Sequence, residues 1–183
     1  MKGKVDHLKE FNIEFKGLKE GKHFYNYSVE DKFFKDFENS LIEKGNIKAN
    51  VLLIKQSTYL TFEIEITGKV TSVCDRCLDP VIVSIKNKGT VYVKFGEEFD
   101  DNSDEVIILP HEEHAINVAQ LIYEFIALAM PMQVIHSNSR EGDKCNNDML
   151  LRLKNMEDNL NHNDDETTDP RWNELKKLID KNK

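Results

Sequence analysis

The sequence predicts an α+β fold in which a central antiparallel β-sheet, or a small open barrel, is covered by one long helix. Two observations indicate this class: strand-like segments follow one another closely between residues 48 and 95, and a broad apolar helical face follows over 118–129. Short connections favour antiparallel neighbours, because parallel strands need long crossovers. A length of 183 residues with 39% hydrophobic content suits one core-bearing domain with extensions.

The first third of the chain contains two segments that read as strands and one that reads as a helix. Apolar residues alternate with a period of two over 11–15, and a second strand is expected over 24–29 after Gly21. We expect these two strands to pair. Residues 30–43 predict a short amphipathic helix, because four apolar side chains share one helical stripe. They are Phe33, Phe34, Phe37 and Leu41.

The centre of the chain is a succession of predicted strands separated by glycines. The strands are expected over 48–55, 59–67, 69–73, 81–85 and 90–95. Gly68 and Gly89 are interpreted as breaks between them. In the helix that follows over 118–129, Asn117 is a suitable N-cap and Pro131 marks the end.

The C-terminal part predicts a division into a domain over 1–155, a flexible linker over 156–168 and an amphipathic helix over 169–183. The linker segment is rich in Asn and acidic residues and has little to bury, so its ordering entropy would be uncompensated. In the last segment Asp169 can cap, Pro170 suits the first turn, and Trp172 begins an apolar edge. Such a short helix is unstable alone, so we expect it to dock on its own domain or on a partner.

Charge and composition limit the classes of function. A net charge of −8 disfavours bulk attraction to nucleic acid, so RNA contact is expected to be local or carried by a partner. From Glu97 to His114 every charged side chain is acidic. We interpret this stretch as a solvated loop around a short strand at 106–109, with a phosphate-mimicking docking surface for a basic protein as the alternative.

The N-terminus and the cysteine count indicate a cytoplasmic protein. The first residues lack the apolar region of a secretory signal, and no run of about 18 apolar residues occurs. Cysteines number three, an odd count that argues against a disulfide framework. Reduced thiols or metal ligands remain as interpretations.

The segment TSVCDRCLDP places Cys74 and Cys77 in a C-x-x-C pair between two predicted strands. A tight turn there would present both sulfurs to one side, as half of a structural zinc site does. The alternatives are a redox pair, which usually lies near a βαβ unit that is not visible here, and two small side chains that fill a turn in the core. These alternatives remain open at the level of the sequence.

A zinc site needs two further ligands, and the loop after the long helix offers His136 and Cys145. The candidate metal site is therefore Cys74, Cys77, His136 and Cys145. A competing arrangement uses His111 and His114 from the acidic stretch. No nucleophile elbow, phosphate-binding loop or dinucleotide fingerprint is present, so we expect no enzymatic activity.

Several of these segments together resemble a known family. VTSVCDRCLDP at 70–80, AMPMQVIH at 129–136, Cys145, and DPRWNELKKL at 169–178 are similar to segments of the YceD-like proteins, the large ribosomal RNA subunit accumulation family. The resemblance covers nearly the whole chain. Many of these proteins have a second C-x-x-C in the loop after the helix, where this chain has only Cys145.

The resemblance implies a non-enzymatic bacterial factor for 23S rRNA accumulation and assembly of the large ribosomal subunit. The implied partners are the subunit precursor, a ribosomal protein and 23S rRNA, and the acidic charge favours the protein. Five residues are the expected partner contacts: Arg76, Asp169, Pro170, Arg171 and Trp172. The resemblance also supports zinc at the four-residue site. The functional alternative is a cytosolic thiol redox protein or sensor that uses the C-x-x-C pair.

Overall fold

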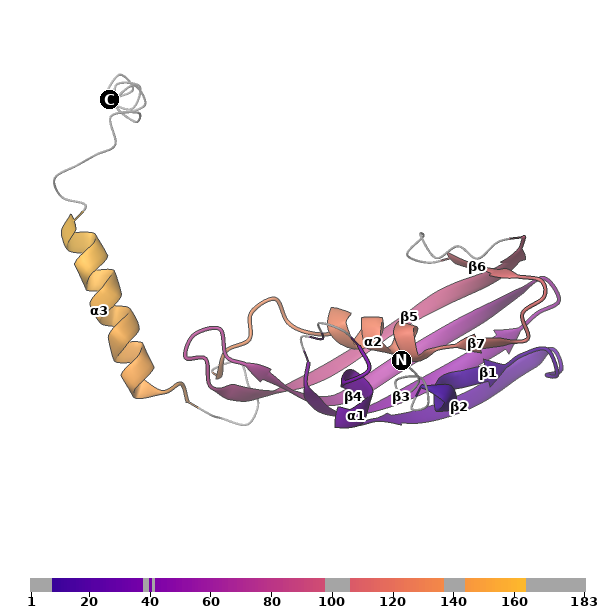
Figure 1. The fold of residues 1–183 in the computed structure, drawn as a ribbon, viewed down its shortest axis with the longest axis horizontal. Coiled ribbons are helices and arrows are strands. Elements are labelled where there is room, and N and C mark those ends of the chain that lie inside the picture. The colour runs from indigo at the N-terminus through magenta and orange to yellow at the C-terminus, as the bar shows by residue number, and fades with distance from the viewer. Residues whose placement is uncertain (1–7, 38–39, 41, 98–105, 137–143, 164–183) are drawn as a thin grey trace, which may run out of the picture.

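A five-stranded open sheet forms the body of the molecule (Figure 1). The computed structural model describes residues 8–37, 40, 42–97, 106–136 and 144–163. The strand order is β2-β3-β4-β5-β6, in which all neighbours are antiparallel except β5 and β6. The strands are β2 (Gly21–Val29), β3 (Lys44–Lys55), β4 (Tyr59–Val73), β5 (Pro80–Gly96) and β6 (Val106–Pro110). The α+β class is confirmed, whereas the barrel alternative is wrong, because among the described residues β2 and β6 do not pair with each other and the sheet stays open.

A second, two-stranded sheet consists of β1 (Asn12–Glu14) and β7 (Ala115–Asn117). The prediction that the first two strands pair with each other is therefore wrong, since β2 pairs along its whole length with β3. A single 3-10 turn, Lys9–Phe11, precedes β1. The ring of Phe11 stacks on Tyr27 of β2, with centroids 4.9 Å apart, so the small sheet packs over the large one.

One face of the large sheet, here called the inner face, carries the hydrophobic core. Helix α2 (Ala119–Leu128), the one-turn helix α1 (Asp31–Phe34) and the small sheet lie over it (Figure 1). Leu53, Phe62 and Ile64 of this face are fully buried. Helix α2 is held partly by Asn87 of β5, whose Nδ2 donates to the carbonyl of Phe125 at 3.0 Å. The opposite, outer face of the sheet is uncovered by any described element.

Glycines lie inside β4 and β5 and do not interrupt them, contrary to the prediction. The expected strands 59–67 and 69–73 are one strand, as are 81–85 and 90–95. At Gly89 an added Cβ would lie 2.7 Å from the ring of Phe125. At Gly68 it would collide with the backbone of Asn46 and Ile47 on β3. These glycines are therefore explained by close approach of neighbouring elements.

The helix predicted over 30–43 is much shorter than expected, since α1 covers only four residues. Its apolar stripe is nevertheless buried, because Phe33 and Phe34 pack into the core and Phe37 stacks on Tyr123 of α2. Aromatic side chains contribute little helix propensity, so packing and not helix extension fixes this segment. Leu41 lies outside the described residues.

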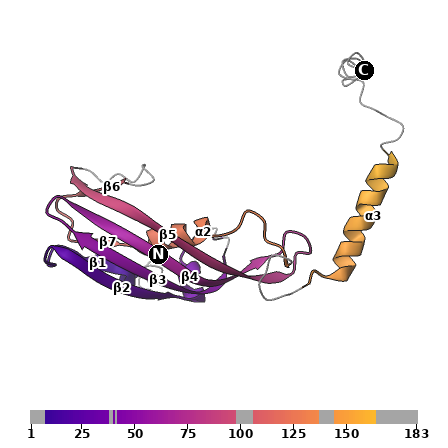
Figure 2. The same ribbon diagram turned by 180° about the vertical axis from the view of Figure 1, so that it is seen from behind.

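Helix α3 (Asn147–Asn163) projects away from one end of the sheet (Figures 1 and 2). It continues beyond residue 155, the predicted end of the domain, into the segment 156–168 that the sequence predicts to be a linker. From Leu151 to Asp158 its side chains are exposed. The predicted C-terminal helix over 169–183 lies outside the described residues. Across the described part of the chain, no helix is both long and apolar enough to span a membrane.

Candidate metal centre

The turn between β4 and β5, residues 74–79, has the form of a knuckle that presents Cys74 and Cys77. Val73 and Pro80 form the last pair of the β4–β5 ladder before the turn. Inside the turn the N–H of Cys74 donates to the carbonyl of Asp79, and the N–H of Leu78 donates to the carbonyl of Cys74, each at 2.9 Å. Leu78 adopts a left-handed conformation with φ of 62°, which is uncommon for a residue other than glycine. These constraints turn both thiols toward the protein, where they are buried.

The loop after α2 is bound to this knuckle through Asp75 and Val134. The N–H of Asp75 donates to the carbonyl of Val134 at 2.7 Å. In return, the N–H of Val134 donates to Oδ2 of Asp75 at 2.7 Å. This reciprocal pair fixes the loop two residues before His136, so the imidazole enters the space above the cysteines.

Four side chains from three separate segments converge at this point: Cys74, Cys77, His136 and Cys145. Their ligand atoms all lie within 4.8 Å of one another. Cys77 Sγ is 3.4 Å and Cys145 Sγ 3.7 Å from His136 Nδ1, and the sulfurs of Cys74 and Cys145 are 3.9 Å apart. The predicted grouping is thus brought together in space.

These separations match the edges of a tetrahedron around a zinc-sized ion. With Zn–S of about 2.3 Å and Zn–N of about 2.0–2.1 Å, tetrahedral geometry requires S···S of about 3.8 Å and S···N of about 3.6 Å. Three of the six separations differ from these values by no more than about 0.2 Å, and all six are within 4.8 Å. The donor set therefore fits a divalent ion with soft and borderline ligands.

The second ring nitrogen of His136 is also bound. Its Nε2 lies 3.2 Å from the carbonyl oxygen of Pro80, the first residue of β5. A carbonyl can only accept, so this contact places the ring proton on Nε2 and leaves the lone pair of Nδ1 for a metal ion. Histidine ligands in metal sites are usually oriented by such a contact.

The electrostatic environment favours a thiolate at Cys74. Burial raises the pKa of this thiol, but hydrogen bonds from the backbone N–H groups of Cys77, Arg76 and His136 are the main causes that outweigh it, and the pKa falls from 9.0 to about 6. The pKa of Cys145 is raised, because burial and the neighbouring Cys74 and Cys77 disfavour a second negative charge. A cation between the three sulfurs would remove this repulsion.

A small apolar cluster surrounds the centre and separates it from the main core. Val81 and Val134 are buried against Cys74 and Cys77, with Met130 and Met149 partly buried at the margin. Met149 lies on the first turn of α3, so this helix begins at the centre. The interpretation of the cysteines as mere turn-filling residues accounts for their burial, but not for the convergence of His136 and Cys145.

The other sequence-predicted residues lie elsewhere. Arg76 is exposed at the tip of the knuckle. His111 and His114 are not near the cysteines: the N–H of His111 donates to the carbonyl of Gly96 at the opposite end of β5, and His114 contacts Lys16. The four predicted contacts at 169–172 fall outside the described residues. Sequence reasoning missed Asp75, although its position between two metal-ligand cysteines was the available signal.

Comparison with known proteins gives one match. No curated protein and no solved structure matches the chain. The model of the family described as large ribosomal RNA subunit accumulation protein YceD matches residues 62–179. The matched range includes the knuckle, α2 and all four residues of the candidate metal centre, so on this match the chain belongs to the YceD family, which is linked to accumulation of the large ribosomal RNA.

Proposed function

We propose that this protein is a non-enzymatic cytoplasmic factor that supports accumulation of 23S rRNA and assembly of the large ribosomal subunit. The family match over residues 62–179 carries this proposal. The site chemistry agrees with it, because a centre closed by four protein ligands leaves no open position at which a metal could activate a substrate. The protein would therefore act by binding.

We propose further that the metal is zinc and that its role is structural. Three thiolates and one imidazole around a tetrahedral space are a common ligand set for structural zinc. The ion would join the β4–β5 knuckle to the loop after α2 and to the start of α3. Metal-binding energy in such a site contributes directly to folding.

The partner is proposed to be the large-subunit precursor, contacted through a ribosomal protein, through 23S rRNA, or through both. Arg76 is a candidate contact because it stands exposed on the knuckle. Asp169, Pro170, Arg171 and Trp172 remain candidate contacts on the basis of the sequence, and they lie within the family match.

Deletion of the gene tests the assembly role. We expect the deletion strain to contain less 23S rRNA relative to 16S rRNA and fewer mature large subunits in sucrose gradients, both restored by the wild-type gene. Affinity purification of the tagged protein should recover large-subunit components. Normal 23S rRNA in the deletion strain would rule out the proposal.

Elemental analysis of the purified protein tests the metal. We expect about one zinc per chain in the wild type and loss of zinc in Cys74→Ser, with a lower melting temperature in the variant and in chelator-treated protein. Ser72→Ala, on the same strand end, is the control and should keep the metal. A melting temperature that responds to neither Cys74→Ser nor chelator would contradict a structural zinc.

A thiol redox protein is the second candidate, favoured by the lowered pKa of Cys74, about 6. A thiolate at neutral pH is the reactive form of cysteine. If the protein is a redox sensor, the purified protein contains no zinc and Cys74 is alkylated equally fast with and without chelator. Protection of the thiols until chelator is added would favour the zinc site.

A further inference from the structure

The outer face of the large sheet is basic, although the chain as a whole carries a net charge of −8. In strands β2 to β5, which the structure describes fully, seven of the eight lysines lie on this face. The exception is Lys55, whose ammonium donates to the carbonyls of Phe15 and Leu18 on the inner side. Only two acidic residues of these strands, Glu63 and Glu65, oppose them.

Five of the lysines form one continuous group toward the metal end of the sheet: Lys44, Lys48, Lys69, Lys86 and Lys88. Lys48 and Lys86 flank Thr67 in one row across three strands, which places their Cα atoms about 10 Å apart. Lys86 and Lys88 contact Glu65 and Glu63 at 3.4 and 3.9 Å. These ion pairs are exposed, so they are weak and can be exchanged for phosphate.

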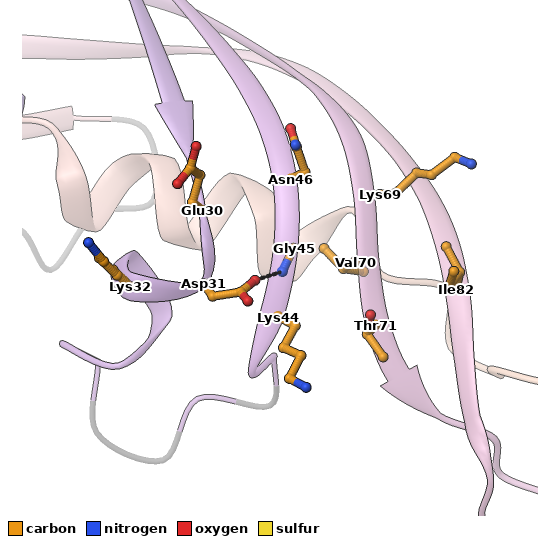
Figure 3. A pocket seen from close by; sticks show the side chains of 10 residues that line it. All are labelled: Glu30, Asp31, Lys32, Lys44, Gly45, Asn46, Lys69, Val70, Thr71 and Ile82. Carbon is orange, nitrogen blue, oxygen red and sulfur yellow. Dashed lines mark hydrogen bonds between the residues drawn. The ribbon is translucent and has the colours of Figure 1, made fainter.

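Two hollows lie on the same face. The larger, of about 570 Å³, lies at the metal end where the edge of β3 extends beyond β2, and it opens partly onto the outer face (Figure 3). Its outer side is lined by Lys44, Asn46, Lys69 and Thr71, and its other side by Glu30, Asp31 and Lys32. The Asp31 carboxylate is occupied by the N–H of Gly45 at 3.0 Å, as the dashed line in Figure 3 shows. The smaller hollow, of about 190 Å³, lies beside Phe24 and includes the carboxamides of Asn26 and Asn50. Glu63, Glu65 and Lys88 also line it, and the two carboxylates pair with Lys88 and Lys86.

The outer face also exposes two aromatic rings. Phe24 on β2 is 73% exposed and Tyr92 on β5 is 42% exposed. Phe24 lies midway along the edge strand β2. An exposed phenylalanine ring is stabilised when another planar group covers it and removes its apolar surface from water. Aromatic rings next to lysines and carboxamides are the components of surfaces on which single-stranded nucleic acid binds: bases stack, amides read base edges, and ammonium groups neutralise phosphates.

We propose that the outer face of the β2–β5 sheet binds single-stranded RNA, with a base stacked on Phe24 and the backbone running over the lysines toward the metal end. The proposal rests on the proposed function for the source of this RNA, which would be large-subunit rRNA. An acidic protein is the competing occupant, and it too would pair with the lysines. The combination of an exposed ring, carboxamides and ammonium groups favours a strand that carries both bases and phosphates. The local charge also explains how an acidic chain can contact RNA.

Fluorescence anisotropy with the full chain tests the proposal. The probe is a labelled, unstructured single-stranded RNA of about 20 nucleotides, long enough to cover a typical site. Lys44→Gln/Lys48→Gln/Lys86→Gln should weaken binding and lower the slope of log K against log salt by about 2, as three phosphate contacts are lost. Phe24→Ala should weaken binding about 5- to 100-fold and leave the salt slope unchanged.

Matched controls separate a local effect from a change in total charge. Lys19→Gln/Lys35→Gln/Lys154→Gln removes three exposed lysines that lie off the outer face, so it should bind RNA almost as the wild type does. All substituted side chains are exposed, and circular dichroism checks that the variants are folded. Equal binding by the two triple variants, or no binding at low salt, would overturn the proposal.

Two further probes decide the class of partner. An RNA duplex of the same length and polyglutamate should both bind more weakly than the single strand and should be insensitive to Phe24→Ala. Equal or tighter binding of polyglutamate would assign the face to an acidic protein and reject RNA.

Complementation distinguishes this proposal from the proposed function. If the wild-type gene restores 23S rRNA in the deletion strain and the Lys44/Lys48/Lys86 variant restores it equally, the assembly role stands and the RNA face is wrong. If the deletion strain has normal 23S rRNA, the assembly role is wrong whatever the purified protein binds.

Discussion

At the scale of single residues, Asp75 joins the two halves of the candidate metal centre, which are the β4–β5 knuckle and the loop after α2. It lies between the two knuckle cysteines and exchanges two hydrogen bonds of 2.7 Å with Val134. Val134 itself is only 8% exposed, so its N–H has no ready access to water if the carboxylate is removed. The residue thus positions His136 without being a ligand.

Asp75→Ala should therefore lower the free energy of unfolding by about 1–3 kcal/mol, the cost of leaving a buried N–H without an acceptor. It should also speed zinc release to a chromogenic chelator, because the loop that carries His136 loses an anchor. Asp75→Asn keeps an oxygen acceptor and should lose less. Asp79→Ala is the control, since the contact of Asp79 with the knuckle is through its backbone carbonyl. Equal effects of Asp75→Ala and Asp79→Ala would contradict the assigned role.

The opposite pKa shifts of Cys74 and Cys145 predict which residue supplies protons when metal binds. With a pKa of about 6, Cys74 is already a thiolate at pH 8, whereas Cys145, with its raised pKa, is protonated. Each Cys→Ser variant keeps three of the four ligands, so zinc must be added at pH 8 in enough excess to saturate the weakened site. Per zinc ion bound, Cys145→Ser should then release about one proton fewer than the wild type, and Cys74→Ser nearly as many as the wild type.

The lowered pKa of Cys74 also determines how the folding stability of the metal-free protein changes with pH. The stabilisation that the Cys74 thiolate gives to the folded state is complete above pH 9.0, the unperturbed pKa, and is lost as the pH falls through about 6.

The protons released when zinc binds can be measured with an indicator dye in weak buffer. A larger deficit for Cys74→Ser than for Cys145→Ser would contradict the assignment.

At the scale of elements, the contact between α2 and β5 depends on the absence of a side chain at residue 89. An alanine Cβ there would lie 2.7 Å from the ring of Phe125, closer than any real carbon contact. Gly89→Ala should reduce the free energy of unfolding by about 1–3 kcal/mol in urea titrations, as overpacking does. Gly17→Ala, where no atom lies within 4 Å, is the neutral control.

A second substitution separates the clash from a general loss of strand structure. Phe125→Leu removes the ring atoms that the new Cβ would meet, so it should recover part of the stability lost in Gly89→Ala. Additive losses in the double variant would mean that the strand, and not the helix contact, requires glycine.

Gly68 and Gly89 show which parts of the fold the sequence predicts and which it does not. Period-two alternation identified the sheet, because each strand buries one face. It could not show that β4 and β5 run through Gly68 and Gly89, since the reason for each glycine lies on another element: Ile47 on β3 and Phe125 on α2. The pairing of β1 with β7 is likewise set by packing between residues about 100 positions apart.

The candidate metal centre was more predictable than the sheet. Cysteine and histidine are uncommon, and only one loop after the long helix offered both His136 and Cys145. The Asp75–Val134 pair and the basic outer face were not predicted, because each depends on the register in which distant segments meet.

At the scale of the whole molecule, α3 contributes to the body mainly through its first turn. Met149 packs against the metal centre, while side chains from Leu151 to Asp158 are exposed. A chain truncated after Met156 should therefore melt within about 2 °C of the full chain, because few buried contacts are removed. The same truncation should weaken recovery of large-subunit components, since residues 169–172 are lost. Unfolding of the truncated chain would show that the missing segment belongs to the core.

The separation of the ligands along the chain has a consequence for synthesis. Cys77 and His136 are 59 positions apart. Cys145 follows His136 by a further 9 positions, so at about 5–20 residues per second the ribosome needs about 3–14 seconds to add the second pair of ligands after the first. During that interval the nascent knuckle holds two thiols that no imidazole covers. A metal ion could be bound by all four side chains only after Cys145 has left the exit tunnel, so the centre can be completed only when most of the polypeptide has been made.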